Sequence, residues 1–125
     1  MKQCISLHGW DIIFYYTPTE QEKKEILSCL SNSDHLSSIT SSLKSAAKDT
    51  GFTYSDYSNC KSILVIYKSS SLGEFINTIE HEKRHLEMHI CDALDVNPYS
   101  EEAAHLSGDL SQKMLEDALC GLINI

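Results

Sequence analysis

Two histidines and a glutamate, spaced for one face of a helix, are the residues of this chain whose arrangement most clearly suggests chemistry. They belong to the run His81-Glu82-Lys83-Arg84-His85, which has the pattern H-E-x-x-H. Residues four apart on a helix lie on the same face, so both imidazoles can point at one metal ion. The glutamate beside them can reach a metal-bound water. The pattern therefore predicts zinc bound by His81 and His85, with Glu82 as general base.

A catalytic zinc ion needs three protein ligands and a water, and the following segment offers two carboxylates for the third position. Asn97-Pro98 is expected to end the first helix, and Glu101-Glu102 to open a second one that folds back. Ala104 and Gly108 share a helical face with Glu101 and would allow close helix packing there, which favours Glu101 over Glu102.

His89 is the competing third ligand, and helix geometry argues against it. It lies eight residues after His81, which is about 12 Å along a helix axis. Two nitrogens that far apart cannot both bind one ion at about 2 Å. We expect His89 to lie on the surface, behind the ligands or on the substrate side.

The elements that position these residues follow from hydrophobic periodicity and turn signals. Strands are expected at 10–16, 52–57 and 61–67, the last being the strongest. Helices are expected at about 18–30, with Thr17 as N-cap, at 34–49, ended by Gly51, at 72–94, and from Ser100 to about 121. The order predicts one α+β domain spanning residues 1–125, with a three-stranded sheet packed on helices.

The predicted helices each have an apolar face. The expected core residues are Ile26, Leu27, Leu30, Leu36, Ile39, Leu43, Ala46, Ala47, Leu72, Phe75, Ile76, Ile79, Leu86, Ile90, Leu94, Leu106, Leu110, Met114 and Leu122. On the 72–94 helix, His81 and His85 lie nearly opposite the apolar face, with Glu82 between. Lys83 lies near the apolar side, so its stem is expected to extend outward.

Composition excludes several classes of function. The 125 residues carry a formal net charge of −8, which argues against nonspecific nucleic-acid binding because such binding needs a basic patch. No apolar run is long enough to span a membrane, and the N-terminus lacks a secretory signal. The five cysteines are scattered, without a C-x-x-C pair. They indicate reduced thiols in a cytoplasmic protein.

With these motifs in place, the chain resembles the gluzincin group of zinc metallopeptidases, small single-domain zincins of bacterial or phage-like origin. The resemblance covers about residues 61–115 and rests on H-E-x-x-H followed by an E-x-x-A motif, here Glu101-Glu102-Ala103-Ala104. It implies zinc held by His81, His85 and Glu101, and hydrolysis of a peptide or protein substrate with Glu82 as base.

Two further features follow from this resemblance. The strand at 61–67 would be the edge strand that binds an extended peptide by strand addition. His105 would donate to the oxyanion or orient a ligand, although a surface histidine is an equally good interpretation.

Two other classes of function stay open. The chain could be a zincin-like metal-binding protein that acts by contacting another protein, with little or no catalysis. It could also be a structural or regulatory protein without a metal. The sequence does not predict the substrate or the oligomeric state.

Overall fold

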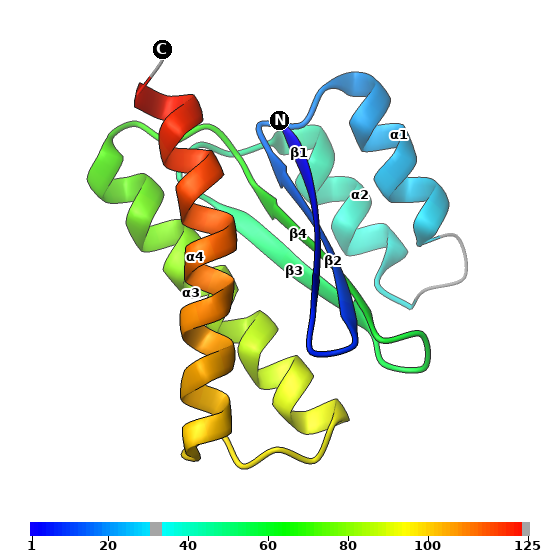
Figure 1. Cartoon of the computed structure of the whole chain (residues 1–125). Coiled ribbons are helices and arrows are strands. Elements are labelled where there is room, and N and C mark those ends of the chain that lie inside the picture. Colours follow the sequence, from blue (N-terminus) through cyan, green and yellow to red (C-terminus); the bar gives the residue numbers. More distant parts are fainter. Residues whose placement is uncertain (31–33, 124–125) are drawn as a thin grey trace.

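A four-stranded sheet between two pairs of helices makes up the fold of this chain, as seen in a computed structural model (Figure 1). The structure describes residues 1–30 and 34–123, and the side chains of residues 1–30 and 34–116. The elements, in chain order, are β1 (Lys2–Leu7), β2 (Trp10–Tyr16), α1 (Glu20–Cys29), α2 (Leu36–Ser45), β3 (Gly51–Asp56), β4 (Lys61–Ile66), α3 (Leu72–Ala93) and α4 (Glu101–Ile123).

The sheet has the strand order β1-β2-β4-β3 and mixes both kinds of pairing. β1 pairs antiparallel with β2, β2 pairs parallel with β4, and β4 pairs antiparallel with β3. The α+β class is confirmed, but the three-stranded sheet is wrong. The prediction missed β1 because only Ile5 of its six residues is buried, so it has little of the apolar alternation that marks a strand.

The strand at 61–67 is not an edge strand, which corrects a second expectation. β4 lies between β2 and β3, and all of its residues except Lys61 are buried. A nearly continuous apolar run is typical of a strand that is covered on both faces. The two edges of the sheet, among the strands that the structure describes, are β1 and β3.

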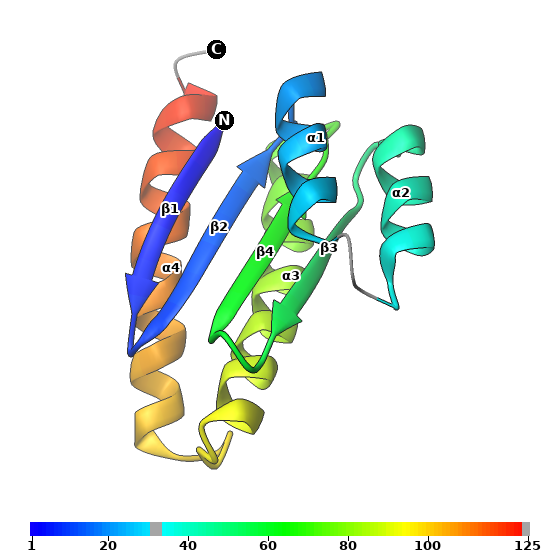
Figure 2. The same cartoon turned by 90° about the vertical axis from the view of Figure 1, so that its right-hand side faces the viewer.

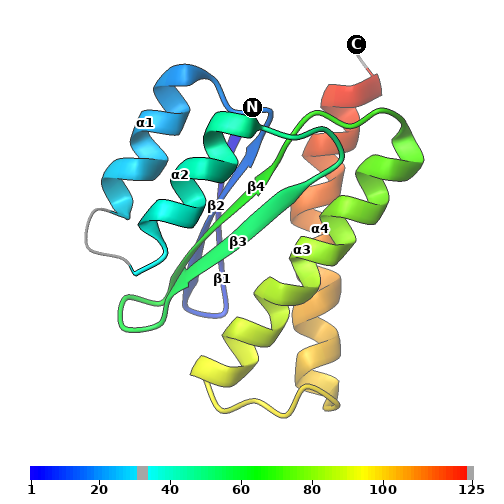
Figure 3. The same ribbon diagram turned by 180° about the vertical axis from the view of Figure 1, so that it is seen from behind.

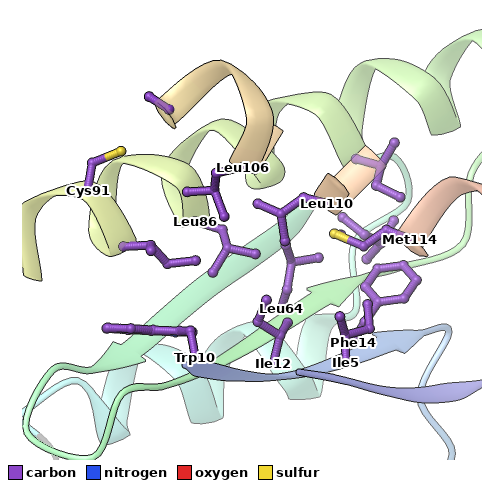
Figure 4. Packing of buried hydrophobic residues seen from close by; sticks show 14 of the residues in the cluster. Ile5, Trp10, Ile12, Phe14, Leu64, Leu86, Cys91, Leu106, Leu110 and Met114 are labelled. Carbon is purple, nitrogen blue, oxygen red and sulfur yellow. The ribbon is translucent and has the colours of Figure 1, made fainter. Parts of the chain in front are cut away.

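Each face of the sheet is covered by one pair of helices (Figure 2). Side chains alternate along β4, so that Leu64 and Ile66 face α3 and α4, whereas Ile63 and Val65 face α1 and α2. Figure 4 shows the first of these two cores, in which Leu106 and Leu110 of α4 lie near Leu86 of α3, and Met114 of α4 lies near Phe14 of β2. The helical layers are therefore separated by the sheet, and each has its own core.

Some helices begin or end at other residues than predicted, because local capping interactions set their boundaries. Thr19 rather than Thr17 is the N-cap of α1, because its capping box with Glu22 satisfies backbone groups at both positions. α2 is shorter than 34–49 and ends at Ala46, which adopts a left-handed conformation with φ 42°. Ser71 caps α3 by accepting from the Glu74 amide.

Most of the predicted core is confirmed, with four exceptions. Ala47, which follows the end of α2, is exposed. Leu72, Ile76 and Leu94 are exposed, because they lie on the side of α3 away from the sheet or at its ends. The side chain of Leu122 lies outside the described residues, and so does most of the break between the first two helices that the sequence predicts at residues 31–34. No helix of the described part is both long and apolar enough to cross a membrane.

Gly51 is not a helix cap but the first residue of β3, and it allows the close approach of β3 to its neighbours. A Cβ atom there would clash with the carbonyl oxygen of Val65, and it would lie 3.0 Å from Ile66 Cδ1 and 3.4 Å from Glu82 Cγ. The residue therefore packs against both β4 and α3.

Gly51→Ala is expected to lower the free energy of unfolding by about 1–3 kcal/mol, because the added methyl overpacks a backbone contact that cannot give way. Gly108→Ala is the matched control: nothing lies within 4 Å of its added Cβ, and alanine inside a helix is favoured by about 0.5–1 kcal/mol. Urea denaturation of both variants tests this. Equal effects of the two substitutions would contradict the packing argument.

Candidate metal and peptide-binding site

The orientation of α3 about its own axis decides which of its residues are buried against the sheet and which are exposed. Phe75, Ile79, Leu86 and Ile90 are buried against the sheet, and these positions define the inner face of the helix. His81 and His85 are exposed on the outer side, as the sequence predicts. Figure 3 shows this helix running beside β3, and α4 packs on its other flank.

The two histidines of the motif are close enough to share one ion. Their Nε2 atoms lie 3.3 Å apart, and the rings meet edge to face with centroids 4.9 Å apart. A tetrahedral zinc ion with zinc–nitrogen distances of about 2.0–2.1 Å requires two ligand nitrogens to be separated by about 3.3–3.4 Å. The spacing of this pair fits two corners of such a site.

Glu82 is held by the neighbouring strand. Its side chain is buried, and Thr53 Oγ1 of β3 lies 2.9 Å from Glu82 Oε1 and 3.1 Å from its backbone carbonyl oxygen. Glu82 and His81 also border the same pocket, of about 290 Å³, together with Asp49 and Gly51. The carboxylate therefore lies beside the first histidine, but it accepts a hydrogen bond from Thr53.

Glu101 and His105 form their own pair on α4. His105 Nε2 lies 3.6 Å from Glu101 Oε1, and both side chains are highly exposed, at 72% and 87%. At 100° per residue they lie about 160–200° around α4 from Ala103, which is buried in the packed face of that helix. Both side chains point away from the packed face of α4.

The position of Glu101 along α4 also separates it from the histidine pair. Ser107 contacts both Lys83 and Glu87, so it marks the level on α4 that is opposite His85. Glu101 lies six residues earlier, about 9 Å along the axis. Within residues 1–30 and 34–116, no three His, Cys, Asp or Glu side chains are grouped closely enough to hold a metal ion. The roles of Glu101, Glu102 and His105 stay predictions.

Lys83 does not extend outward as expected. Its side chain is buried towards α4, where Nζ lies 2.8 Å from Glu87 Oε1 and donates to Ser107 Oγ at 3.1 Å. Ser107 Oγ in turn donates to Glu87 Oε1 at 2.8 Å. Because Glu80 and Glu87 of α3 and Ser107 of α4 satisfy the ammonium group, burial of Lys83 is tolerated, and its charge points away from the histidine pair.

On the β3 side, His89 joins a polar network that sequence reasoning missed. Its Nδ1 lies 2.6 Å from Ser55 Oγ, and its ring contacts Tyr57. Burial is the main factor that lowers the pKa of His89. The sequence pattern that could have predicted this network is the placement of Thr53 and Ser55 on one face of β3. Only the order of strands in the sheet shows that both side chains face α3.

β3 also carries an open edge with a pocket beside it. Of the described strands, β3 pairs with β4 alone. A pocket of about 410 Å³ lies along it and is lined by residues of α2, β3 and α3, namely His35, Ser38, Ile39, 52–55, Tyr57 and His89. Since α2 and α3 cover opposite faces of the sheet, this pocket reaches around the edge of β3.

Comparisons with protein-family models, with curated proteins and with solved structures gave no significant match to this chain. The resemblance to zincins therefore rests on the motif residues alone.

The buried pair of Lys83 and Glu87 generates a stability prediction. Glu87→Gln is expected to cost about 3–5 kcal/mol of unfolding free energy, because it leaves a buried ammonium group short of its nearest anion. The double variant Lys83→Met/Glu87→Leu is expected to recover most of this loss. The exposed pair Lys23–Glu20 is the control, and Glu20→Gln is expected to cost at most about 1 kcal/mol. Denaturant unfolding measures all three. A double variant as unstable as Glu87→Gln would contradict this account.

Proposed function

We propose that this chain is a metal-binding interaction module, in which His81 and His85 hold a zinc ion beside a strand edge that takes an extended peptide. The observation that carries the proposal is the 3.3 Å separation of the two exposed Nε2 atoms, which matches two corners of a tetrahedral zinc site.

The ligand set supports binding more strongly than catalysis. Two imidazoles leave two of four coordination positions for other donors, and bound zinc supplies Lewis acidity at those positions. A peptide side chain or terminal carboxylate that approaches along β3 could complete the set. Zinc would then couple metal binding to the binding of a partner.

The backbone of β3 supports the peptide half of the proposal. Thr50 O accepts from Tyr67 N at 2.9 Å, so Thr50 and Tyr67 are a hydrogen-bonded pair of the antiparallel ladder. The alternation of such ladders directs Phe52 and Tyr54 towards β4, and the amide and carbonyl groups of Thr53 and Ser55 towards the open edge. An extended peptide can add to these groups as a further strand.

A zinc-dependent metallopeptidase is the second candidate. It is favoured by the position of Glu82, which follows His81 directly and borders the same pocket. In that activity Glu82 would take the proton of the attacking water and pass it to the leaving amine. Before it could act as a base, the Glu82 carboxylate would have to break the hydrogen bond that it accepts from Thr53.

Zinc binding tests the first candidate. Isothermal titration of metal-free protein is expected to give one zinc per chain, with binding lost in His81→Ala and in His85→Ala. Saturating zinc is expected to raise the melting temperature by several degrees, because a ligand at 100 times its Kd stabilises the folded state by about 2.7 kcal/mol. The controls His105→Ala and Glu101→Gln are expected to bind like the wild type. Loss of binding in Glu101→Gln would restore Glu101 as a ligand, and unchanged binding in both His81→Ala and His85→Ala would refute the site.

Peptide hydrolysis separates the two candidates. Zinc-loaded protein is incubated with a mixture of unstructured peptides, and products are followed by mass spectrometry. We expect no cleavage beyond that of Glu82→Gln, because the residues with described side chains group only two ligands and the Glu82 carboxylate is engaged by Thr53. Cleavage at least about 100-fold faster in the wild type than in Glu82→Gln would instead establish the peptidase. Glu80→Gln, which alters an exposed carboxylate on the same helix, is the control.

A further inference from the structure

A second constellation of reactive groups lies on the β3 side of α3, independent of the two metal-binding histidines. Ser55 Oγ of β3 lies 2.6 Å from His89 Nδ1 of α3, and both residues line the pocket of about 410 Å³. A serine hydroxyl within hydrogen-bond reach of an imidazole is the arrangement that activates serine as a nucleophile.

The neighbouring hydrogen bonds favour one direction for the hydrogen bond between Ser55 and His89. The indole N–H of Trp10 can only donate, and it does so to Ser62 Oγ at 2.8 Å. Ser62 is buried, and of its two side-chain partners only Ser55 Oγ, at 2.6 Å, can accept its hydrogen. The hydrogen of Ser55 is then left for His89 Nδ1, so His89 carries its own proton on Nε2.

The surroundings of His89 suit a proton acceptor. Burial lowers the pKa of His89, as does the nearby His85, so the ring is neutral at pH 7 and its Nδ1 can accept. The Asp92 carboxylate acts in the opposite direction on the same pKa, so it favours the imidazolium that forms when a proton is transferred. Ser55 and His89 thus have the chemical roles of a nucleophile and a base.

The pocket indicates which acyl group would fit. Phe52, Tyr54, Tyr57 and Ile39 supply apolar and aromatic walls, and none of the residues that line the pocket is Asp, Glu, Lys or Arg. Its volume is in the range of sites for small organic ligands, about 300–1,000 Å³. The amide of Ser55 at the open edge of β3 is one N–H donor available to a developing oxyanion.

We propose that Ser55 and His89 form a nucleophilic dyad that cleaves esters of small apolar or aromatic acids. Ser55 Oγ forms a bond to the acyl carbon as its proton passes to His89 Nδ1. The bond from that carbon to the leaving oxygen then breaks, and the alcohol leaves with the proton from His89. Water next attacks the acyl-serine and gives a proton to His89, which returns it to Ser55 Oγ as the acid is released. The net reaction converts an ester and water into an acid and an alcohol.

A fluorophosphonate probe tests the dyad in the folded wild-type chain, because it transfers its phosphonyl group to an activated serine with loss of fluoride. Peptide mass spectrometry is expected to locate the label on Ser55, in the presence or absence of a metal chelator. His89→Gln is expected to slow labelling at least about 100-fold, the contribution of a positioned base. Ser41→Ala, which alters an exposed serine of α2 that does not line the pocket, is expected to leave labelling unchanged.

Hydrolysis of p-nitrophenyl butyrate provides the matching activity, and it is expected to be lost in Ser55→Ala and retained in Ser41→Ala. Failure to label Ser55 under conditions that fully label trypsin would overturn the proposal, and so would equal labelling of the wild type and His89→Gln. Circular dichroism and thermal melting confirm that each variant is folded. Because the reaction needs no zinc, failure of the metal-site proposal would leave this result unaffected.

Discussion

The close, polar contact between α3 and β3 is the constraint on which the rest of this structure depends. Gly51 removes the side chain that would hold β3 away from Val65 and Glu82. Further along β3, Thr53 contacts Glu82 and Ser55 contacts His89, with oxygen–oxygen and oxygen–nitrogen distances of 2.9 and 2.6 Å. These hydrogen bonds are directional, so they fix the rotation and the register of α3 more sharply than apolar packing does.

That rotation has chemical consequences on every side of α3. The inner face packs on the sheet, and the far flank is fixed by the Lys83–Glu87 pair and Ser107 of α4. The remaining side faces solvent, which is where His81 and His85 bring their Nε2 atoms to 3.3 Å. The same arrangement leaves the amides of β3 open along one edge. The proposed metal-binding pair and the proposed peptide-binding edge therefore both depend on one helix–strand contact.

The sequence predicted those parts that depend on local periodicity. Phe75, Ile79, Leu86 and Ile90 defined the inner face of α3, and the structure buries all four. Features set by long-range pairing were missed. An apolar run such as 63–66 does not show whether its strand lies at the edge or in the centre of a sheet. For this reason β4 was predicted to be an edge strand. The position of Glu101 depends on how α4 packs, and the contact of Ser55 with His89 joins residues 34 positions apart. Neither has a local signal.

The central claim is that α3 is rotated so that His81 and His85 share one metal ion without the help of α4. Long-range ¹H–¹⁵N spectra of the imidazole nitrogens during a zinc titration test it most directly. The Nε2 resonances of His81 and His85 are predicted to shift together and to saturate at one zinc per chain, while those of His105 stay in place. A titration that moves His105 with His85, or that leaves His81 and His85 unshifted, would contradict this account.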